Sequence, residues 1–221
     1  MSIRSTAVGN GNGISRFRLA VLFFLLILPT SIGVVWLCSK AYQASVQKAV
    51  VHIINNDNGM AWYAYQSSAP GADDLTGTPP GPSCLRDLLG IDFFSEVVSV
   101  DLREPNALSH LGKLPRLSAL RLYGKGVTDA EMEHVASLSG LELLSLNNTR
   151  VTDHGLTRLS TLRGLKWLAV SGYAITDESL PTLTRMRSLQ WLMLDQTRIS
   201  PAGVKKLQKA LPACTVVGDE M

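Results

Sequence analysis

The chain has 221 residues, of which 46% are hydrophobic and 18% are charged, so it is long enough for one folded domain with an appendage and too apolar to be disordered. Its net charge of +3 comes from the N-terminus, because residues 1–40 carry four basic side chains and no acidic ones, whereas the rest carries 17 basic and 18 acidic side chains. A near-neutral body lacks the basic surface that phosphate binding requires, so we expect no nucleic-acid partner.

Residues 19–38, LAVLFFLLILPTSIGVVWLC, form an apolar stretch of twenty positions without a charge. A helix of this length matches a hydrocarbon core of about 30 Å, so we predict one transmembrane helix that acts as a signal anchor in the lipid bilayer. A cleaved signal peptide is the alternative, although its apolar run is usually about 7–15 residues. Three arginines precede the span, so we expect residues 1–18 to be a flexible cytoplasmic tail and the body to be exported.

Residues 41–96 are not repetitive, unlike the part of the chain that follows. Val46, Val50 and Ile53 have helical spacing, and the aromatic run MAWYAYQ suits a strand. Residues 67–83 are rich in Pro, Gly and Ser and predict a loop, and CLRDLL predicts a short helix. We expect residues 41–96 to cap one end of a repeat domain; a small independent module is the alternative.

Four copies of a 24-residue unit begin at Leu117, Leu141, Leu165 and Leu189. Each opens with L-x-x-L-x-L, with Val170 as the one replacement, and continues with apolar residues at helical spacing. The alternation predicts a short strand, and the later spacing predicts one apolar face of a helix. A single unit cannot bury that face alone, so the copies must stack into a solenoid.

The chain resembles the leucine-rich repeat family, whose pattern L-x-x-L-x-L-x-x-N/C-x-L recurs every 20–29 residues. The wording VTDxGLxxLxxL is similar to bacterial, membrane-anchored relatives of the cysteine-containing, F-box-associated class. The resemblance implies an α/β fold with parallel strands on the concave side and helices on the convex side, over residues 97–221. It begins with a shortened unit at Val97 and ends with a strand near Val216. The ninth place of each copy departs from the family, with Lys125, Thr149, Tyr173 and Thr197; the threonines can still bond the loop backbone.

An Asp–His pair in the second copy, Asp153 and His154, is the first candidate for chemistry. Asp153 has counterparts in the other copies, Asp129, Asp177 and Pro201, and each follows a Thr or Ser. Proline cannot bind a metal or act as an acid. Each Thr or Ser is therefore interpreted as a helix N-cap, and the Asp or Pro after it as the first helical residue, with Glu131 completing a capping box.

Other catalytic signals are missing from the sequence. It contains no G-x-S-x-G, phosphate-binding glycine loop or H-E-x-x-H motif, so we expect no enzyme activity, cofactor or metal. Cys84 and Cys214 flank the stack and should lie too far apart for a disulfide.

The odd positions of each repeat strand should face the concave surface. They supply an apolar patch with polar margins, as is typical of interfaces. The predicted partner-binding residues are Leu143, Trp167, Trp191, Met193, Arg121, Tyr123 and Asp195. The hypothesis is a non-catalytic protein that binds an unknown protein or cell-envelope ligand there. The alternatives are that the pre-repeat segment covers this face, that the tryptophans only stack between strands, or that the chain is a self-associating structural component of the envelope.

Overall fold

The computed structural model describes residues 12–66 and 77–218, with side chains from residue 32 onward. The chain divides into two compact units, Met1–Gln43 and Ala44–Met221. A long helix, α1 (Asn12–Asn56), begins in the first unit and ends in the second. Among the side chains described, no helix is long and apolar enough to cross a membrane. All of the predicted tail 1–18 lies outside the described side chains, as do most of the predicted span 19–38 and most of the predicted loop 67–83.

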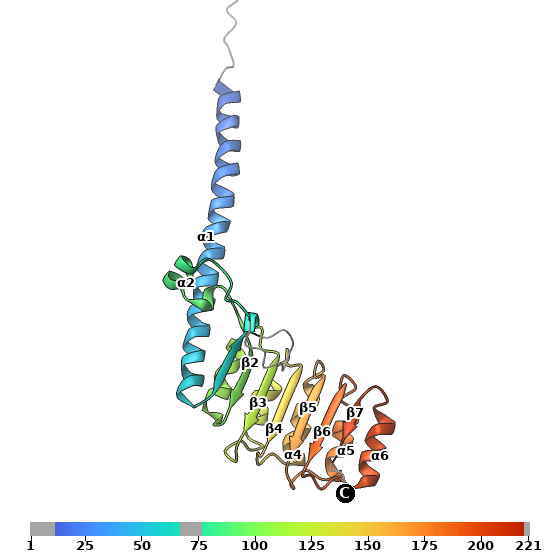
Figure 1. Ribbon diagram of the computed structural model, residues 1–221. Coiled ribbons are helices and arrows are strands. Elements are labelled where there is room, and N and C mark those ends of the chain that lie inside the picture. Colours follow the sequence, from blue (N-terminus) through green and yellow to red (C-terminus); the bar gives the residue numbers. More distant parts are fainter. Residues whose placement is uncertain (1–11, 67–76, 219–221) are drawn as a thin grey trace, which may run out of the picture. The chain divides into compact units, whose positions relative to one another are not determined.

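A seven-stranded sheet in chain order, β1 to β7, is the centre of the second unit (Figure 1). The strands are β1 (Met60–Tyr63), β2 (Val97–Leu102), β3 (Ala119–Tyr123), β4 (Leu143–Asn147), β5 (Trp167–Ser171), β6 (Trp191–Asp195) and β7 (Thr215–Val217). From β2 onward every neighbouring pair is parallel. This order confirms the predicted strand of each copy, the shortened first unit and the closing strand near Val216.

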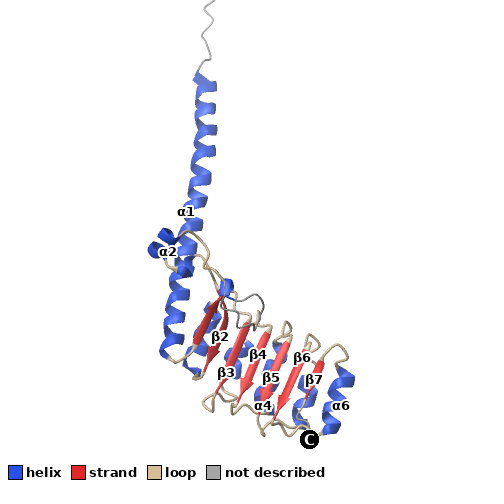
Figure 2. Ribbon diagram, in the orientation of Figure 1, coloured by secondary structure: helices blue, strands red, loops and turns tan. Residues whose placement is uncertain are grey.

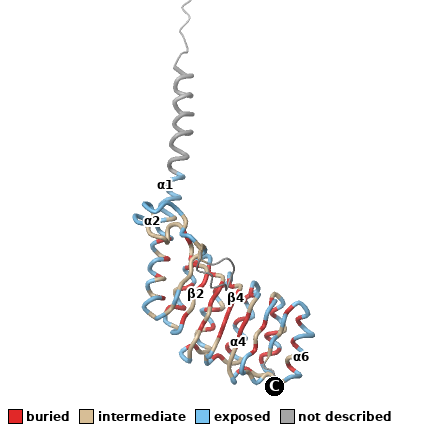
Figure 3. Tube along the Cα trace, in the orientation of Figure 1, coloured by how far each residue is buried: buried red, intermediate tan, exposed pale blue. Residues whose placement is uncertain are grey.

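The leucines of successive copies lie side by side in the sheet. Leu120 pairs with Leu144, Leu144 with Leu168 and Leu168 with Leu192, all in register, and all four side chains are fully buried. Strand residues alternate between two faces, so the pattern x-L-x-L turns every leucine to the same side. Buried residues therefore run along the strands in Figure 3 and form one continuous core under the sheet.

Helical segments connect the parallel strands and lie behind the sheet in Figure 2. They are η3 (Pro105–Lys113), α3 (Met132–Ala136), α4 (Asp153–Arg158), η4 (Leu159–Thr161), η5 (Asp177–Ser179), α5 (Leu180–Leu183) and α6 (Pro201–Ala210), where η denotes 3₁₀ geometry. Most are short, because a 24-residue unit must also hold a strand and two turns. The predicted helix starts at Asp153, Asp177 and Pro201 are confirmed, but the one at Asp129 is wrong, since α3 begins at Met132.

Each strand of the full copies is followed by a residue with positive φ. These residues are Gly124 (102°), Asn148 (54°), Gly172 (132°) and Gln196 (52°), spaced 24 apart. Glycine carries no Cβ penalty in this region, and asparagine tolerates the left-handed conformation better than most residues. Gln196 is therefore the strained member of the series.

The repeated aspartates join neighbouring copies, a role that the sequence did not reveal. Asp153 accepts hydrogen bonds from the backbone N–H of Thr176 (2.9 Å) and from its hydroxyl (2.7 Å). Asp129 does the same with Thr152, and Asp177 with Ser200. The interpretation of these aspartates as first helical residues is thus incomplete, because each carboxylate also connects its unit to the next one.

The first and last copies lack one of these connections between neighbouring copies, because each has a proline where the others have aspartate. Pro105 holds the first helical position of the shortened unit and offers no carboxylate, so Thr128 instead donates its N–H and its hydroxyl to Glu131, each at 2.7 Å. The bond from the Thr128 N–H to Glu131 that the predicted capping box requires is therefore present, but Thr128 does not cap α3, which begins at Met132. At the other end Pro201 begins α6. No further copy follows in the described chain, so there is no repeat-position Thr or Ser for a carboxylate at residue 201 to accept from. The ninth-place expectation is wrong for Thr149, whose Oγ1 is buried without a hydrogen-bond partner in the described chain.

Residues before the repeats pack onto the β2 end of the sheet. β1 pairs antiparallel with β2, and Val50 and Ile54 of α1 belong to the same buried core. Gln47, only 5% exposed, donates to Asp92 (3.0 Å) and to the carbonyl of Ser95 (2.9 Å), and its amide oxygen accepts from Val97 N–H (3.1 Å).

The remaining described helical segments also precede the repeats. They are η1 (Ala64–Gln66), α2 (Ser83–Leu89) and η2 (Ile91–Phe93). The Tyr63 hydroxyl donates to Asp92 in η2 (2.9 Å), and burial together with this bond raises the pKa of Tyr63 well above its usual value. The polar network around Asp92 therefore fixes how η2 and α1 meet the first strands.

Candidate functional site

The face of the sheet opposite the core carries three rows of side chains, which we call the first, second and third rows. The first row runs through residues that pair directly across neighbouring strands, namely Trp62, Ser99, Ala119, Leu143, Trp167, Trp191 and Thr215. Trp191 is 39% exposed and Trp167 is half-buried, whereas Leu143 is buried, with 7% exposed. On β4, β5 and β6 the accessible apolar surface of this row therefore comes from Trp167 and Trp191, and Leu143 adds little to it.

The second row lies one step further along the strands. Arg121 forms an ion pair with Asp101 (3.2 Å) across β3 and β2, and both side chains are largely covered. Ser145 and Ala169 are buried, and Met193 at the far end is half-buried. Ser145 Oγ has no hydrogen-bond partner in the part of the chain that is described. Among these residues, Met193 therefore supplies most of the accessible apolar surface.

The third row lies at the carboxyl ends of the strands and contains Tyr123, Asn147, Ser171 and Asp195. Three of its members border a pocket of about 770 Å³, which also reaches the loops after β3, β4, β5 and β6. A second pocket of about 500 Å³ begins at Tyr123 and shares Asn148 with the first. The carboxyl ends of the strands are thus hollowed, whereas the first row presents flat indole rings.

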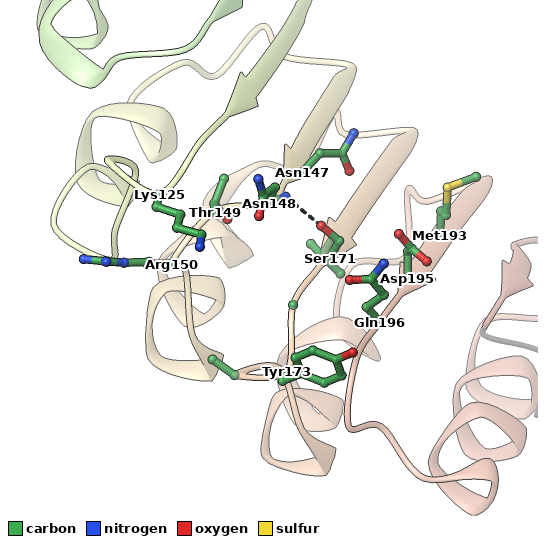
Figure 4. Close-up of a pocket in the computed structure, with 13 residues that line it drawn as sticks. Lys125, Asn147, Asn148, Thr149, Arg150, Ser171, Tyr173, Met193, Asp195 and Gln196 are labelled. Carbon is green, nitrogen blue, oxygen red and sulfur yellow. Dashed lines mark hydrogen bonds between the residues drawn. The ribbon is translucent and has the colours of Figure 1, made fainter.

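Charged and polar side chains are distributed unevenly in the larger pocket (Figure 4). Lys125 and Arg150 lie at one end, Asp195 and Gln196 lie at the other, and Tyr173 borders the loop after β5. Ser171 accepts a hydrogen bond from the backbone N–H of Asn148 (2.8 Å) and so ties the turn after β4 to β5. This bond fixes the floor of the pocket and leaves the surrounding side chains available to a ligand.

The structure brings the predicted partner-binding residues together only in part. Trp167 and Trp191 pair directly, and Ala169 pairs with Met193. Arg121 and Tyr123 lie on β3, which β4 and β5 separate from Trp191 and Met193 on β6. Met193 and Asp195 border the larger pocket, which the sequence did not reveal. Its other polar members include Lys125, Asn148, Arg150, Tyr173 and Gln196. The turns that form this pocket have Gly, Asn, Gly and Gln at the eighth position of the four copies, and this was the sequence sign of them. Binding residues lie on such loops more often than on strands.

The cysteines are unpaired among the described residues. Cys84 is exposed and Cys214 is buried, and both are free thiols. Burial raises the pKa of Cys214, so this thiol is poorly reactive.

Copies of L-x-x-L-x-L that lie in register as parallel strands, with helical segments on one face, define the architecture. The fold is a leucine-rich repeat solenoid. No family model matches the chain, and no curated protein matches it either.

Several solved structures are similar to part of this chain. Internalin C2 of Listeria monocytogenes is 24% identical, with a TM-score of 0.39, over 49% of this chain and 44% of that one. Internalin F of the same organism is 21% identical, with a TM-score of 0.39, over 54% and 40%. A leucine-rich repeat protein of Leptospira interrogans is 24% identical, with a TM-score of 0.34, over 49% and 27%. The chain therefore spans less than half the length of each.

Proposed function

We propose that the chain is a non-catalytic binding protein that captures another protein or a cell-envelope ligand on the open face of its sheet. The observation that carries this proposal is the direct pairing of Trp167 with Trp191, two indoles that are not sealed in the core. Large aromatic side chains dominate the binding free energy of many interfaces, because they bury much area and lose little rotamer freedom. A ligand that covers both rings removes the largest apolar surface of the first row from water.

Polar groups around these indoles favour a ligand of mixed character. Met193 is half-buried and Asp195 is exposed on β6, the strand of Trp191, whereas the half-buried Tyr123 lies on β3, two strands from Trp167. Arg121 is held largely covered by Asp101. Exposed polar groups at a margin orient a ligand and contribute less free energy than a buried apolar centre. We therefore assign the affinity to Trp167 and Trp191 and the orientation to Tyr123 and Asp195. Arg121 acts mainly by holding β2 and β3 together.

We also propose that residues 19–38 anchor the protein in a bilayer as a single pass, with the N-terminus in the cytoplasm and the repeats exported, as in the bacterial layout that the sequence resembles. The charge-free run of twenty residues and the three preceding arginines support this arrangement. Alkaline extraction of membranes, followed by protease treatment of intact cells, tests it. An anchored protein stays in the membrane pellet and loses its repeats to external protease; a protein released by alkali would contradict the anchor.

The test of the binding function is a capture experiment with the full chain in mild detergent. Trp167→Ala and Trp191→Ala are compared with Arg163→Ala and Arg187→Ala, which replace exposed side chains in the turns before β5 and β6. The tryptophan variants should keep the circular dichroism spectrum and lose ligands that the wild type and the arginine variants retain. Unchanged capture by a folded Trp167→Ala/Trp191→Ala protein would exclude the indoles as the binding surface.

Self-association is the second candidate, and the end of the sheet favours it. β7 has three residues, lies last in the order and pairs with β6 alone among the described strands. Val217 on β7 is 39% exposed, and an edge strand can pair with a second chain. Sedimentation of the full chain at increasing concentration separates the two functions, because a binding module stays monomeric and a structural component forms larger species.

A further inference from the structure

The larger pocket at the carboxyl ends of β4, β5 and β6 has a chemical character that differs from that of the tryptophan row. Its lining contains three side-chain amides, Asn147, Asn148 and Gln196, together with the hydroxyl of Ser171. Each amide both donates and accepts hydrogen bonds, as does each hydroxyl group of a sugar. A volume of about 770 Å³ is within the range of small-ligand sites and large enough for a short oligosaccharide.

Two cations at one end of this pocket have no carboxylate partner among the described residues. Lys125 and Arg150 are exposed and line the same end of the pocket, where Figure 4 shows the Arg150 side chain extending outward, and neither forms an ion pair with any described residue. An anionic group at this end of the pocket is attracted by both positive charges. Arg150 can hold a carboxylate with two parallel hydrogen bonds, and Lys125 can add a third.

An exposed aromatic ring completes the lining. Tyr173, in the turn after β5, is 63% exposed and lines the pocket together with Ala174. The face of an aromatic ring binds the apolar C–H face of a sugar ring, while the hydroxyls of the sugar point outward to polar partners. An apolar ligand would leave the three amides unpaired, so the lining disfavours it.

Gln196 gives independent evidence that this pocket is used. It adopts φ 52° at a place where two of the other three copies have glycine and one has asparagine. A residue that keeps a side chain in a strained backbone conformation often does so at a functional site. Figure 4 shows the Gln196 amide beside Asp195 at the end of the pocket opposite Lys125 and Arg150.

We propose that this pocket binds a carboxylate-bearing saccharide, with Lys125 and Arg150 on the carboxylate, Tyr173 against a sugar ring and Gln196 on hydroxyl groups. The proposal deepens the binding function and rests on it, since it assigns an acidic glycan as the ligand class on the same face of the sheet. Asp195 restricts the negative charge of the ligand to the end of the pocket near Lys125 and Arg150.

Calorimetry with three probes of three units each tests the ligand class. The probes are trigalacturonic acid, the neutral trisaccharide maltotriose and the peptide triglutamate, each titrated into the full chain in mild detergent. Trigalacturonic acid should bind at least about tenfold more tightly than maltotriose, as expected when charged hydrogen bonds are present. Equal binding of the two saccharides, or no binding of either, would overturn the proposal. Tighter binding of triglutamate would make the pocket a peptide site and would overturn the saccharide assignment.

Variants connect the signal to the pocket. Lys125→Gln/Arg150→Gln should weaken trigalacturonic acid binding about tenfold or more, and Tyr173→Ala should weaken it as well. Arg163→Gln/Arg187→Gln removes the same charge at the opposite ends of the strands and should leave it unchanged. Gln196→Gly should weaken binding while it raises the melting temperature, a combination that a purely structural role does not produce.

The outcome also distinguishes this proposal from the binding function itself. A failure of all saccharide probes, with ligand capture still dependent on Trp167 and Trp191, removes the saccharide site and leaves the binding face. If none of these variants loses saccharide binding and none loses ligand capture, both the saccharide site and the binding face are excluded.

Discussion

Asp153 and Thr176 belong to neighbouring copies and are joined by two hydrogen bonds, from the threonine N–H (2.9 Å) and hydroxyl (2.7 Å) to the two oxygens of one carboxylate. The same pair of bonds occurs between Asp129 and Thr152. Stability in a stacked solenoid is a sum of unit and interface contributions, so each such connection acts on one interface.

Asp153→Ala should lower the free energy of unfolding by about 2 kcal/mol, because it leaves the partly buried N–H of Thr176 without an acceptor. Urea unfolding followed by circular dichroism measures the loss. His154→Ala changes the exposed neighbouring side chain and should stay within about 0.5 kcal/mol of the wild type. Equal effects of the two substitutions would show that the carboxylate does not connect the copies.

The last connection should weaken in acid. Hydrogen bonds from the hydroxyl and the N–H of Ser200 lower the pKa of Asp177 below its usual value. A lowered folded-state pKa adds stability above the unfolded-state pKa, about 3.9 for Asp, and that stability is lost as the pH falls through the folded-state value. The stability difference between the wild type and Asp177→Asn should therefore be constant near neutrality and shrink below about pH 4. Urea midpoints measured at several pH values check this, and a difference that grows in acid would contradict it.

Gln196→Gly should raise the free energy of unfolding by about 1 kcal/mol, since glycine relieves the left-handed backbone strain at φ 52°. Asn148→Gly is the matched variant at the equivalent turn, and it should gain less because asparagine tolerates this conformation. Thermal unfolding of both variants measures the difference. A loss of stability in Gln196→Gly would mean that its side chain makes a stabilising contact.

Gln47 should be among the most sensitive residues before the repeats. Its buried amide serves Asp92, Ser95 and Val97, so Gln47→Ala leaves several polar groups unpaired and should cost about 3 kcal/mol. Lys48→Ala, an exposed neighbour on the same helix, should have little effect. Denaturant midpoints measure the loss of stability. A Gln47→Ala variant as stable as the wild type would show that water replaces the contacts of Gln47.

The repeat strands were predictable because every copy has to turn its leucines to one side of the sheet. Leu120, Leu144, Leu168 and Leu192 therefore needed only a period of 24 residues and the alternation of a strand. Side-chain partners were not predictable in this way. The repeated aspartates suit a helix start by composition, and only the stacking shows that each one reaches the next copy.

The candidate site was likewise predictable only in its strand residues. Odd strand positions predicted the rows that hold Trp167, Trp191 and Met193, because strand geometry alone places them. Their exposure was not predictable, and Leu143 is buried where a contact surface was expected. The pocket depends on the paths of four loops, and the sequence offered only the eighth-place residues as a sign of it.

Site-specific photo-crosslinking in cells tests most directly whether the open face of the sheet binds a ligand. A photoreactive phenylalanine analogue is placed at position 191, and in a separate strain at position 187, an exposed residue in the turn before β6. We expect position 191 to give a crosslinked species with another molecule and position 187 to give none. A crosslink from position 187 with none from position 191 would contradict binding at the tryptophan row.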